Sequence, residues 1–246
     1  MTDIILGMGE VGETLFDLLV DRKFHCVGID LDDSKSKNFP ENGIIPNPEY
    51  LHVCLPGELI KFTDIVLDWI DKIKNIEVVI IHSTVKPGTT KTIQERSSIP
   101  ILFSPVRGVH KRFLNDIKKY TKFISFDGVW DIDTKMKKDL ENRFEKVNWM
   151  STTKTAELAK ILVDTTYYGW LINYAQITKM ICEKENVDFD EMWKFADEIH
   201  ENLGNRPKMF PGIIGGHCVI PNLDLIEYEN LDIVKKINQM YEKFKK

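Results

Sequence analysis

Short apolar runs alternate with amphipathic stretches through the first half of the chain. The runs are rich in Val, Ile and Leu and occupy residues 4–6, 26–29, 51–54, 78–81, 101–103 and 123–126. Stretches between them, such as residues 11–21 and 59–73, have the spacing of helices with one apolar face. This alternation of strands and helices predicts an α/β fold in which helices cover a parallel sheet.

The pattern changes after residue 150 to the longer period of helices. Helical spacing runs over residues 155–185, 188–202 and 223–244, with a stretch rich in Gly and Pro at residues 204–221. We therefore predict two domains, an α/β domain over residues 1–150 and a helical domain with a long central helix over residues 151–246.

The long helix predicted over residues 155–185 is apolar around most of its circumference. Its middle carries a cluster of large side chains, namely Tyr167, Tyr168, Trp170, Leu171 and Tyr174. A helix that is apolar on nearly all sides must be covered on all sides. We expect a homodimer built around this helix. The alternative is that the sheet and the two following helices cover it within one chain.

Composition limits the function classes. A net charge of -5 argues against a nucleic-acid binder, which needs an excess of clustered Lys and Arg. The four cysteines lie far apart with no C-x-x-C pair, so neither a zinc site nor a disulfide framework is indicated. The sequence has no apolar run near the roughly 18 residues of a membrane helix and no basic segment before its first apolar run, so we expect a cytoplasmic protein.

A glycine motif directly follows the first predicted strand. Its residues are Gly7, Met8, Gly9, Glu10, Val11 and Gly12. In this context, G-x-G-x-x-G gives a tight turn, lets a diphosphate approach the backbone and places it at a helix N-terminus. Asp30 ends the second strand, where a carboxylate accepts hydrogen bonds from an adenosine ribose. The motif predicts a Rossmann-like domain that binds NAD.

Two alternatives to this interpretation remain. The glycines can form only a turn between strand and helix, with Asp30 a solvated strand end. Lys35 and Lys37 lie just beyond Asp30 and could reach the 2′-phosphate of NADP. Further along the chain, Leu55 and Pro56 follow the third strand, and we assign them to the cofactor site as well.

The segment after the fourth strand, residues 83–89, has two interpretations of equal weight. Ser83 and Thr84 could lie at the cofactor, with Thr84 beside the nicotinamide. Alternatively, the segment is a Pro-Gly turn that leads into a helix capped by Thr89 or Thr90.

Charged residues interrupt the apolar surface of the long helix. Glu157, Lys160 and Asp164 are spaced i, i+3 and i+7, which places them on one face of an α-helix. An exposed Lys160–Asp164 pair would be an ordinary surface salt bridge. The apolar residues that flank Lys160 favour a buried lysine instead, and a buried lysine needs a partner or a task.

A second glycine-rich segment, Gly215-Gly216-His217-Cys218, precedes the last helix. Adjacent glycines let backbone approach a ligand closely, and the Cys218 thiol could act as a nucleophile if a base or cation lowered its pKa. A cysteine is more often a small buried hydrophobe, which is our interpretation for Cys26, Cys54 and Cys182.

Four of these segments occur in the order typical of one enzyme family. They are residues 7–12, residues 83–89, Ala156-Glu157-Leu158-Ala159-Lys160 and Gly215-Gly216-His217-Cys218. The chain resembles the UDP-glucose/GDP-mannose dehydrogenase family. The Gly-Gly-His-Cys form is most similar to the branch that oxidises UDP-N-acetyl-hexosamines such as UDP-N-acetylmannosamine, and Arg107 matches an Arg of that branch.

The resemblance implies the oxidation of a sugar primary alcohol to a carboxylate with two NAD+. In that family a cysteine attacks the aldehyde, and the adduct is oxidised to a thioester that water hydrolyses. Carried over, Cys218 is the nucleophile, Lys160 stabilises or protonates the developing oxyanion, and Thr84 helps position water. These roles agree with the chemistry of a thiolate and a fixed cation.

The chain departs from the family pattern at three site positions. The family has Asn where this chain has Asp164, Asp where it has Asn222, and a catalytic Glu where it has Val106. Asp164 and Asn222 could have exchanged their chemistry across one site, or hydrolysis could be impaired. Residues 30–51 are also too few for the family's extra strand and helix.

Length gives a further departure, since the family carries a third, C-terminal domain for the nucleotide half of its substrate. We expect that another chain supplies that half, that the substrate is not a full nucleotide sugar, or that only binding is retained. Two alternative functions stay open: a two-electron hydroxyacid dehydrogenase resembling the 6-phosphogluconate and 3-hydroxyisobutyrate enzymes, with Cys218 dispensable, and an NAD-binding protein without turnover.

Overall fold

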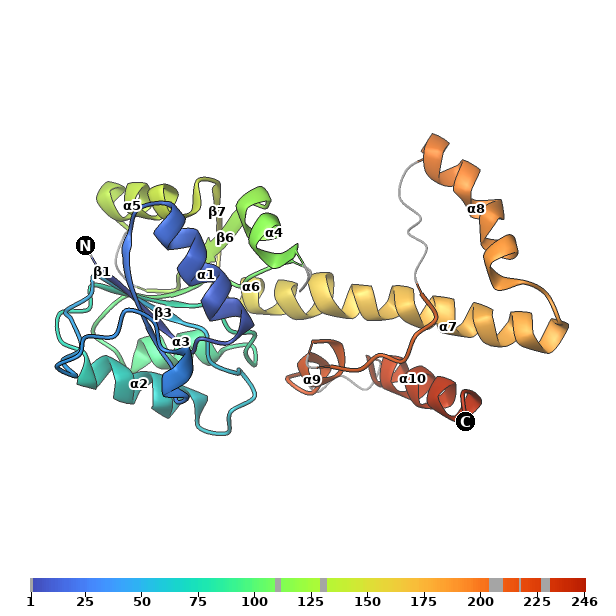
Figure 1. Ribbon diagram of the computed structural model, residues 1–246, viewed down its shortest axis with the longest axis horizontal. Coiled ribbons are helices and arrows are strands. Elements are labelled where there is room, and N and C mark those ends of the chain that lie inside the picture. Colours follow the sequence, from blue (N-terminus) through green and yellow to red (C-terminus); the bar gives the residue numbers. More distant parts are fainter. Residues whose placement is uncertain (1, 109–111, 129–131, 204–209, 217, 227–230) are drawn as a thin grey trace. The chain divides into compact units, whose positions relative to one another are not determined.

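The computed structural model describes residues 2–108, 112–128, 132–203, 210–216, 218–226 and 231–246. The chain divides into two compact units, Met1–Lys160 and Ile161–Lys246. Each unit is described by itself below (Figure 1).

The first unit is built around a seven-stranded sheet. The strands are β1 (Thr2–Leu6), β2 (His25–Ile29), β3 (Tyr50–Val53), β4 (Val78–Ile81), β5 (Ile101–Phe103), β6 (Lys122–Ser125) and β7 (Val147–Met150). The helices are α1 (Glu10–Asp21), the 3-10 turn η1 (Asp33–Lys35), α2 (Phe62–Lys72), α3 (Thr89–Glu95), α4 (Phe113–Lys119), α5 (Thr134–Phe144) and α6 (Thr153–Ala159).

The strand order in the sheet is β2-β1-β3-β4-β5-β6-β7. All neighbouring strands pair in parallel except β5 and β6, which meet in antiparallel fashion at Phe103 and Ser125. The predicted α/β fold is confirmed, but the all-parallel sheet is wrong at this edge. Strand β7 was not predicted, because its side chains are only half-buried or exposed and include a polar Asn148.

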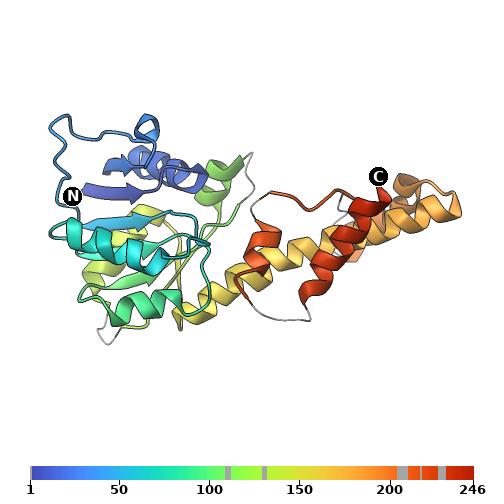
Figure 2. The same ribbon diagram turned by 90° about the horizontal axis from the view of Figure 1, so that it is seen from below.

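Apolar side chains cover both faces of the sheet, and helices lie on each side of it (Figure 2). One face packs against α2, α3 and α6 through Val66, Ile93 and Ala156. The other packs against α1, α4 and α5 through residues such as Leu15, Ile117 and Leu140. Strands buried on both faces explain why their sequences read as continuous apolar runs.

The order of strands defines where a ligand can bind. The chain leaves β1 towards β2 on one side and crosses to β3 on the other, so β1 and β3 flank a switch point. In open α/β sheets, ligands bind in the crevice beyond the carboxyl ends of the strands at such a point. The glycine motif and the segment after β3 both lie at these ends.

The second unit consists of helices. Its elements are the π-helix η3 (Lys160–Thr166), whose first residue closes the first unit, α7 (Tyr167–Glu185), α8 (Phe189–Leu203), α9 (Val219–Leu223) and α10 (Asp232–Phe244). Gly169 of α7 allows a close approach, since a Cβ there would lie 2.7 Å from Val219 Cγ1. Among the described helices, none is long and apolar enough to cross a membrane.

Two predicted helices differ from the structure. The helix predicted over residues 155–185 is interrupted by η3, in which the backbone bonds shift from i→i+4 to i→i+5. The helix predicted over residues 223–244 is not continuous, because α9 ends at Leu223 and α10 begins at Asp232.

Candidate cofactor and active site

Two glycines of the motif are explained by the fold itself. Gly7 has φ +90°, and a Cβ there would lie 2.9 Å from the Cys54 carbonyl oxygen. A Cβ on Gly12 would lie 1.8 Å from the Gly7 carbonyl oxygen, so only glycine lets α1 sit this close to the turn. These residues make the tight passage from β1 into α1.

Gly9 has no such explanation within the chain. Its φ is -71°, which any residue adopts, and no described atom lies within 4 Å of the position a Cβ would take. Gly9 is exposed and is the N-cap of α1, where it offers no side chain to the first amide groups of the helix. The open space therefore adjoins backbone donors at the positive end of a helix, an arrangement that suits a diphosphate.

Asp30 is tied to this turn. Its Oδ2 accepts a 2.7 Å hydrogen bond from the Met8 amide, and its Oδ1 accepts one of 3.0 Å from the Asp32 amide. Each carboxylate oxygen can accept more than one hydrogen bond, so Asp30 retains capacity for a ribose hydroxyl. The Met8 side chain is buried and packs against Gly28. The structure thus places Asp30 beside the glycine motif, and its role at an adenosine ribose stays a prediction.

The lysines that could favour a 2′-phosphate are paired with carboxylates. Lys37 Nζ lies 2.8 Å from Glu13 Oε1 and 3.7 Å from Asp17 Oδ1. The hydrogen bond to Glu13 foremost, with the charges of Asp17 and Glu13, raises the pKa of Lys37, and burial opposes the rise. Lys35 Nζ lies 3.8 Å from Asp32.

The segments after β3 and β4 contact each other directly. Ser83 is buried, and its hydroxyl donates a 2.5 Å hydrogen bond to the Leu55 carbonyl oxygen. A Cβ on Gly57 would lie 1.7 Å from the Thr84 carbonyl oxygen. Thr84 and Leu55 are half-buried, and Pro56 is exposed. The predicted cofactor residues of these two segments therefore share one edge of the sheet.

Glu157 explains the segment that leads into α3. Its carboxylate accepts hydrogen bonds from the Gly88 amide (2.5 Å), the Thr90 amide (2.9 Å) and the Thr90 hydroxyl (2.7 Å). Burial raises its pKa, and these bonds oppose the rise. The predicted cap by Thr89 or Thr90 is wrong, since the N-cap is Gly88 with φ +97° and the capping oxygens come from α6. Glu157 is therefore a structural residue.

Lys160 and Asp164 lie in the π-helix, so α-helical spacing does not place them on one face with Glu157. Both residues are half-buried, whereas the sequence favoured a buried Lys160. Val106 is buried, and the neighbouring Arg107 donates a 2.7 Å hydrogen bond to the Thr121 carbonyl oxygen. The guanidinium also lies 4.7 Å from the centre of the Phe123 ring, which fixes it on β6.

In the second unit, buried amides hold the segment that leads to Cys218. The Asn238 side chain of α10 accepts a hydrogen bond from the Ile214 amide on Oδ1 (2.8 Å). It donates one from Nδ2 to the Ile214 carbonyl oxygen (3.1 Å). Gln176 of α7 donates to the Gly212 carbonyl oxygen (2.7 Å), and the Tyr241 hydroxyl donates to that of Pro211. Sequence reasoning missed these residues, whose only signal was polarity on an otherwise apolar helix face.

Cys218 is half-buried at the N-cap of α9, and Asn222 is buried within α9. His217, which precedes the cysteine, lies outside the described residues. The meeting of Cys218 with Lys160 at one site stays a prediction. Cys26 and Cys182 fit the interpretation of small buried hydrophobes, whereas Cys54 is half-buried. Burial raises the pKa of the Cys26 and Cys54 thiols to about 12.

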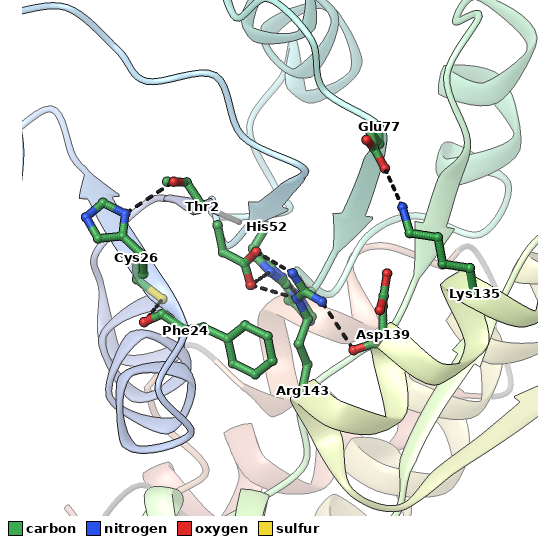
Figure 3. A network of polar contacts seen from close by, with 11 residues as sticks. Thr2, Phe24, Cys26, His52, Glu77, Lys135, Asp139 and Arg143 are labelled. Atoms are coloured by element: carbon green, nitrogen blue, oxygen red, sulfur yellow. Dashed lines mark hydrogen bonds and ion pairs between the residues drawn. The ribbon is translucent and has the colours of Figure 1, made fainter.

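Sequence reasoning also missed a buried polar cluster in the first unit, formed by side chains of β1, β3 and α5. Asp3 and Arg143 are both 0% exposed. Arg143 donates from Nε and Nη2 to the two oxygens of Asp3, each at 2.8 Å. His52, labelled with Arg143 in Figure 3, also contacts Asp3, with its Nε2 3.4 Å from Oδ2. The aspartate inside β1 and the histidine inside β3 were the available signal.

Comparisons with known proteins find similarity in sequence and in fold. No family model matches the chain. The chain is 25% identical over 258 residues to the UDP-N-acetyl-D-mannosamine dehydrogenase of Methanocaldococcus jannaschii, across 87% of this chain. It spans 58% of the length of that relative.

Solved structures extend the likeness in fold. A UDP-D-ManNAc dehydrogenase from Pyrococcus horikoshii superposes with a TM-score of 0.79 at 17% identity, covering 99% of this chain and 69% of that one. A 3-hydroxyisobutyrate dehydrogenase from Mycobacterium tuberculosis gives a TM-score of 0.64 at 14% identity, covering 99% and 93%. In sequence and in fold, this chain resembles the UDP-N-acetyl-D-mannosamine dehydrogenase branch of the UDP-glucose/GDP-mannose dehydrogenase family, over part of the length of those enzymes.

Proposed function

We propose that the chain is an NAD-dependent dehydrogenase that oxidises the primary alcohol of a nucleotide sugar, or of a similar sugar, to a carboxylate. The observation that carries the proposal is the open space at Gly9, beside the backbone donors of α1 and next to Asp30. Packing within the chain requires Gly7 and Gly12 but not Gly9. A dinucleotide diphosphate accounts for all three glycines.

The residues present fit the cofactor. Gly9 and the first amides of α1 would hold the diphosphate, Asp30 the adenosine ribose, and the edge formed by Leu55, Ser83 and Thr84 the nicotinamide half. NAD rather than NADP fits better, because Asp30 would repel a 2′-phosphate and Lys37 is already bound by Glu13 and Asp17. When bound, NAD+ supplies a hydride acceptor for the alcohol carbon.

The chain's own residues supply the remaining chemistry. Lys160 would stabilise the oxygen where negative charge develops, and Thr84 would help position water. The Cys218 sulfur would add to the aldehyde carbon, so that a second hydride loss leaves a thioester. Water then displaces the sulfur and releases the carboxylate. Asp164 and Asn222 stand where the family has Asn and Asp, and we propose that they orient water from exchanged positions.

The stoichiometry of NADH tests this mechanism. The protein is incubated with NAD+ and, separately, with UDP-N-acetyl-hexosamines, UDP-glucose and simple sugar phosphates. We expect two NADH per molecule of a nucleotide sugar. Cys218→Ser should stop after the first NADH, because the hydroxyl is a far weaker nucleophile than the thiolate. Lys160→Ala should slow both oxidations by about 10²- to 10³-fold through loss of oxyanion stabilisation.

Two matched variants control this experiment. Cys182→Ala changes a cysteine in α7, and Lys154→Ala changes an exposed lysine in α6. Both should leave the two-NADH stoichiometry intact. If Cys218→Ser also yields two NADH per substrate, the thioester mechanism is wrong for this chain.

The 3-hydroxyisobutyrate dehydrogenase likeness favours a second candidate function. That protein is covered over 93% of its length, far more than the curated relatives. A two-electron hydroxyacid dehydrogenase would produce one NADH per hydroxyacid and would not need Cys218. An NAD-binding protein without turnover would produce none.

We also propose that two copies of the chain associate through α7. Large apolar side chains on this helix remain exposed within one chain, with Tyr167 56% and Tyr174 60% exposed. A dimer mass is expected by light scattering at micromolar concentration. A Tyr167→Glu, Tyr174→Glu variant should be monomeric, because carboxylates would have to be buried in the interface. Ile60→Glu, at an exposed apolar residue of the first unit, serves as the control. A monomeric mass for the unaltered protein would refute the dimer.

A further inference from the structure

A row of buried titratable side chains runs across the first unit and has no role in the mechanism above. Lys122 of β6, His82 directly after β4, His52 of β3 and Asp3 of β1 are all buried. His82 Nε2 lies 3.0 Å from His52 Nδ1, and Lys122 Nζ lies 3.2 Å from His82 Nδ1. His52 Nε2 faces Asp3 (Figure 3). The row therefore links the core to the carboxyl end of β5.

The contacts of one atom, His82 Nδ1, require opposite tautomers. Nδ1 lies 2.7 Å from the Ser104 carbonyl oxygen, which can only accept, so this contact needs a proton on Nδ1. The same Nδ1 lies 3.2 Å from Lys122 Nζ. When Lys122 is an ammonium it can only donate, so this contact needs an unprotonated Nδ1 with its lone pair facing Nζ. A neutral imidazole satisfies one of these contacts at a time.

The protonation of Lys122 decides between the two arrangements. As an ammonium, Lys122 donates to His82 Nδ1 and to the carbonyl oxygens of Ser104 (2.9 Å) and Pro105 (3.1 Å), which uses its three protons. His82 then carries its proton on Nε2 and donates to His52 Nδ1, and His52 donates from Nε2 to Asp3. As a neutral amine, Lys122 leaves Nδ1 of His82 free to carry the proton and donate to Ser104.

The surroundings keep both histidines neutral. Burial foremost lowers the pKa of His52 and of His82, and Lys122 lowers both further. Arg143 acts against a charge on His52, and Asp3 favours one. The pKa of Lys122 is lowered to about 7, foremost by burial; Cys54 opposes this, and the charges of Lys160 and Arg107 add to it. The proton that exchanges near neutral pH is therefore the one on Lys122.

We infer that Lys122, His82 and His52 form a proton relay in which His82 changes tautomer when Lys122 gains or loses a proton. On deprotonation, Nζ gives a proton to His82 Nδ1, His82 Nε2 gives one to His52 Nδ1, and His52 gives up its Nε2 proton, which leaves to solvent. All three groups then end neutral, with His82 and His52 both in the Nδ1–H tautomer, and His52 no longer donates to Asp3. The ammonium form of Lys122 holds the segment at Ser104 and Pro105, and the neutral form loosens that hold. The relay requires neither a cofactor nor a substrate, so it stands apart from the proposed function.

Nitrogen-15 NMR of the histidine rings tests the relay in the full chain. With resonances assigned by through-bond correlation to the backbone, we expect His82 to change from the Nε2–H to the Nδ1–H tautomer as pH rises, with a midpoint near 7. The ring should not become an imidazolium over this range. The amides of Val106 and Arg107 should titrate with the same midpoint.

Two variants lock the relay in opposite states. Lys122→Met removes the ammonium, so His82 should stay in the Nδ1–H tautomer at every pH. Lys122→Arg remains charged at every pH tested, so His82 should stay in the Nε2–H tautomer. If one variant fails to fold, the other and the unaltered protein still decide. A single His82 tautomer throughout the titration of the unaltered protein, or an unchanged midpoint in either variant, would overturn the relay.

Discussion

Replacing Asp3 by asparagine is expected to lower the free energy of unfolding by about 3–5 kcal/mol. Asp3 and Arg143 are both 0% exposed and share two hydrogen bonds of 2.8 Å. Asparagine fills nearly the same volume but leaves the guanidinium charge buried without its hydrogen-bonded counterion, and the more distant charge of Asp139 compensates only in part. The aromatic rings of Tyr50 and Phe24 lie against Arg143 and replace only part of that interaction. Urea unfolding at pH 7 measures the loss.

A surface pair and a double variant control this measurement. Lys118 Nζ and Asp21 Oδ2 lie 2.6 Å apart, but both side chains are exposed, so Asp21→Asn should cost far less than Asp3→Asn. An Asp3→Leu, Arg143→Met variant removes both charges together and should recover most of the stability. Equal losses for Asp3→Asn and Asp21→Asn would contradict the prediction.

The loss of stability at low pH should depend on the same pair, Asp3 and Arg143. Burial raises the pKa of Asp3, but hydrogen bonds from His52 and Arg143 outweigh burial and hold it below its usual range. A depressed pKa in the folded state contributes stability that is present above the unfolded pKa and is lost as pH falls through the folded pKa. Asp3→Asn should therefore show a shallower loss of stability below about pH 4.

Replacing Gly9 by valine is expected to weaken NAD+ binding by about 100-fold or more, or about 3 kcal/mol. The side chain would fill the space that no described atom occupies within 4 Å of the Cβ position. It would also stand over the first amides of α1, where the diphosphate would bind. Calorimetric titration with NAD+ measures the affinity, and thermal unfolding should show little change.

Two further variants separate binding from folding. Gly12→Ala places a Cβ 1.8 Å from the Gly7 carbonyl oxygen, so it should destabilise the unit. Val20→Ala, at an exposed residue near the other end of α1, should change neither property. Tight NAD+ binding by Gly9→Val would contradict the assignment of this space to the cofactor.

Local patterns predicted the features that depend on local sequence. Strands β1 to β6, helices α1 and α2 and the turn at Gly7 all follow from apolar spacing and from glycine chemistry. The reversal between β5 and β6 and the added strand β7 depend on which edges pair, and the apolar period does not encode this. The π-helix at Lys160–Thr166 is likewise invisible to a period of 3.6 residues.

The candidate site was predictable only where a motif is contiguous. Gly7, Gly9, Gly12 and Asp30 belong to one strand–helix–strand unit, and the structure brings them together. Glu157 binds a helix 67 residues earlier, and Lys122 contacts a histidine 40 residues earlier. Such partners meet through tertiary packing, so a sequence shows an unusual charged residue but not its contact.

The pairing of Asp3 with Arg143 also bears on how the protein is made. These residues are 140 positions apart, and β1 lies between β2 and β3 inside the sheet. While the chain emerges from the ribosome, the first strands can collapse long before α5 has been synthesised. Until then a native β1 would bury a carboxylate without its cation, which disfavours early folding of the amino-terminal half. We expect nascent chains that end before Thr134 to remain open to proteolysis, and chains that expose α5 fully to become protected.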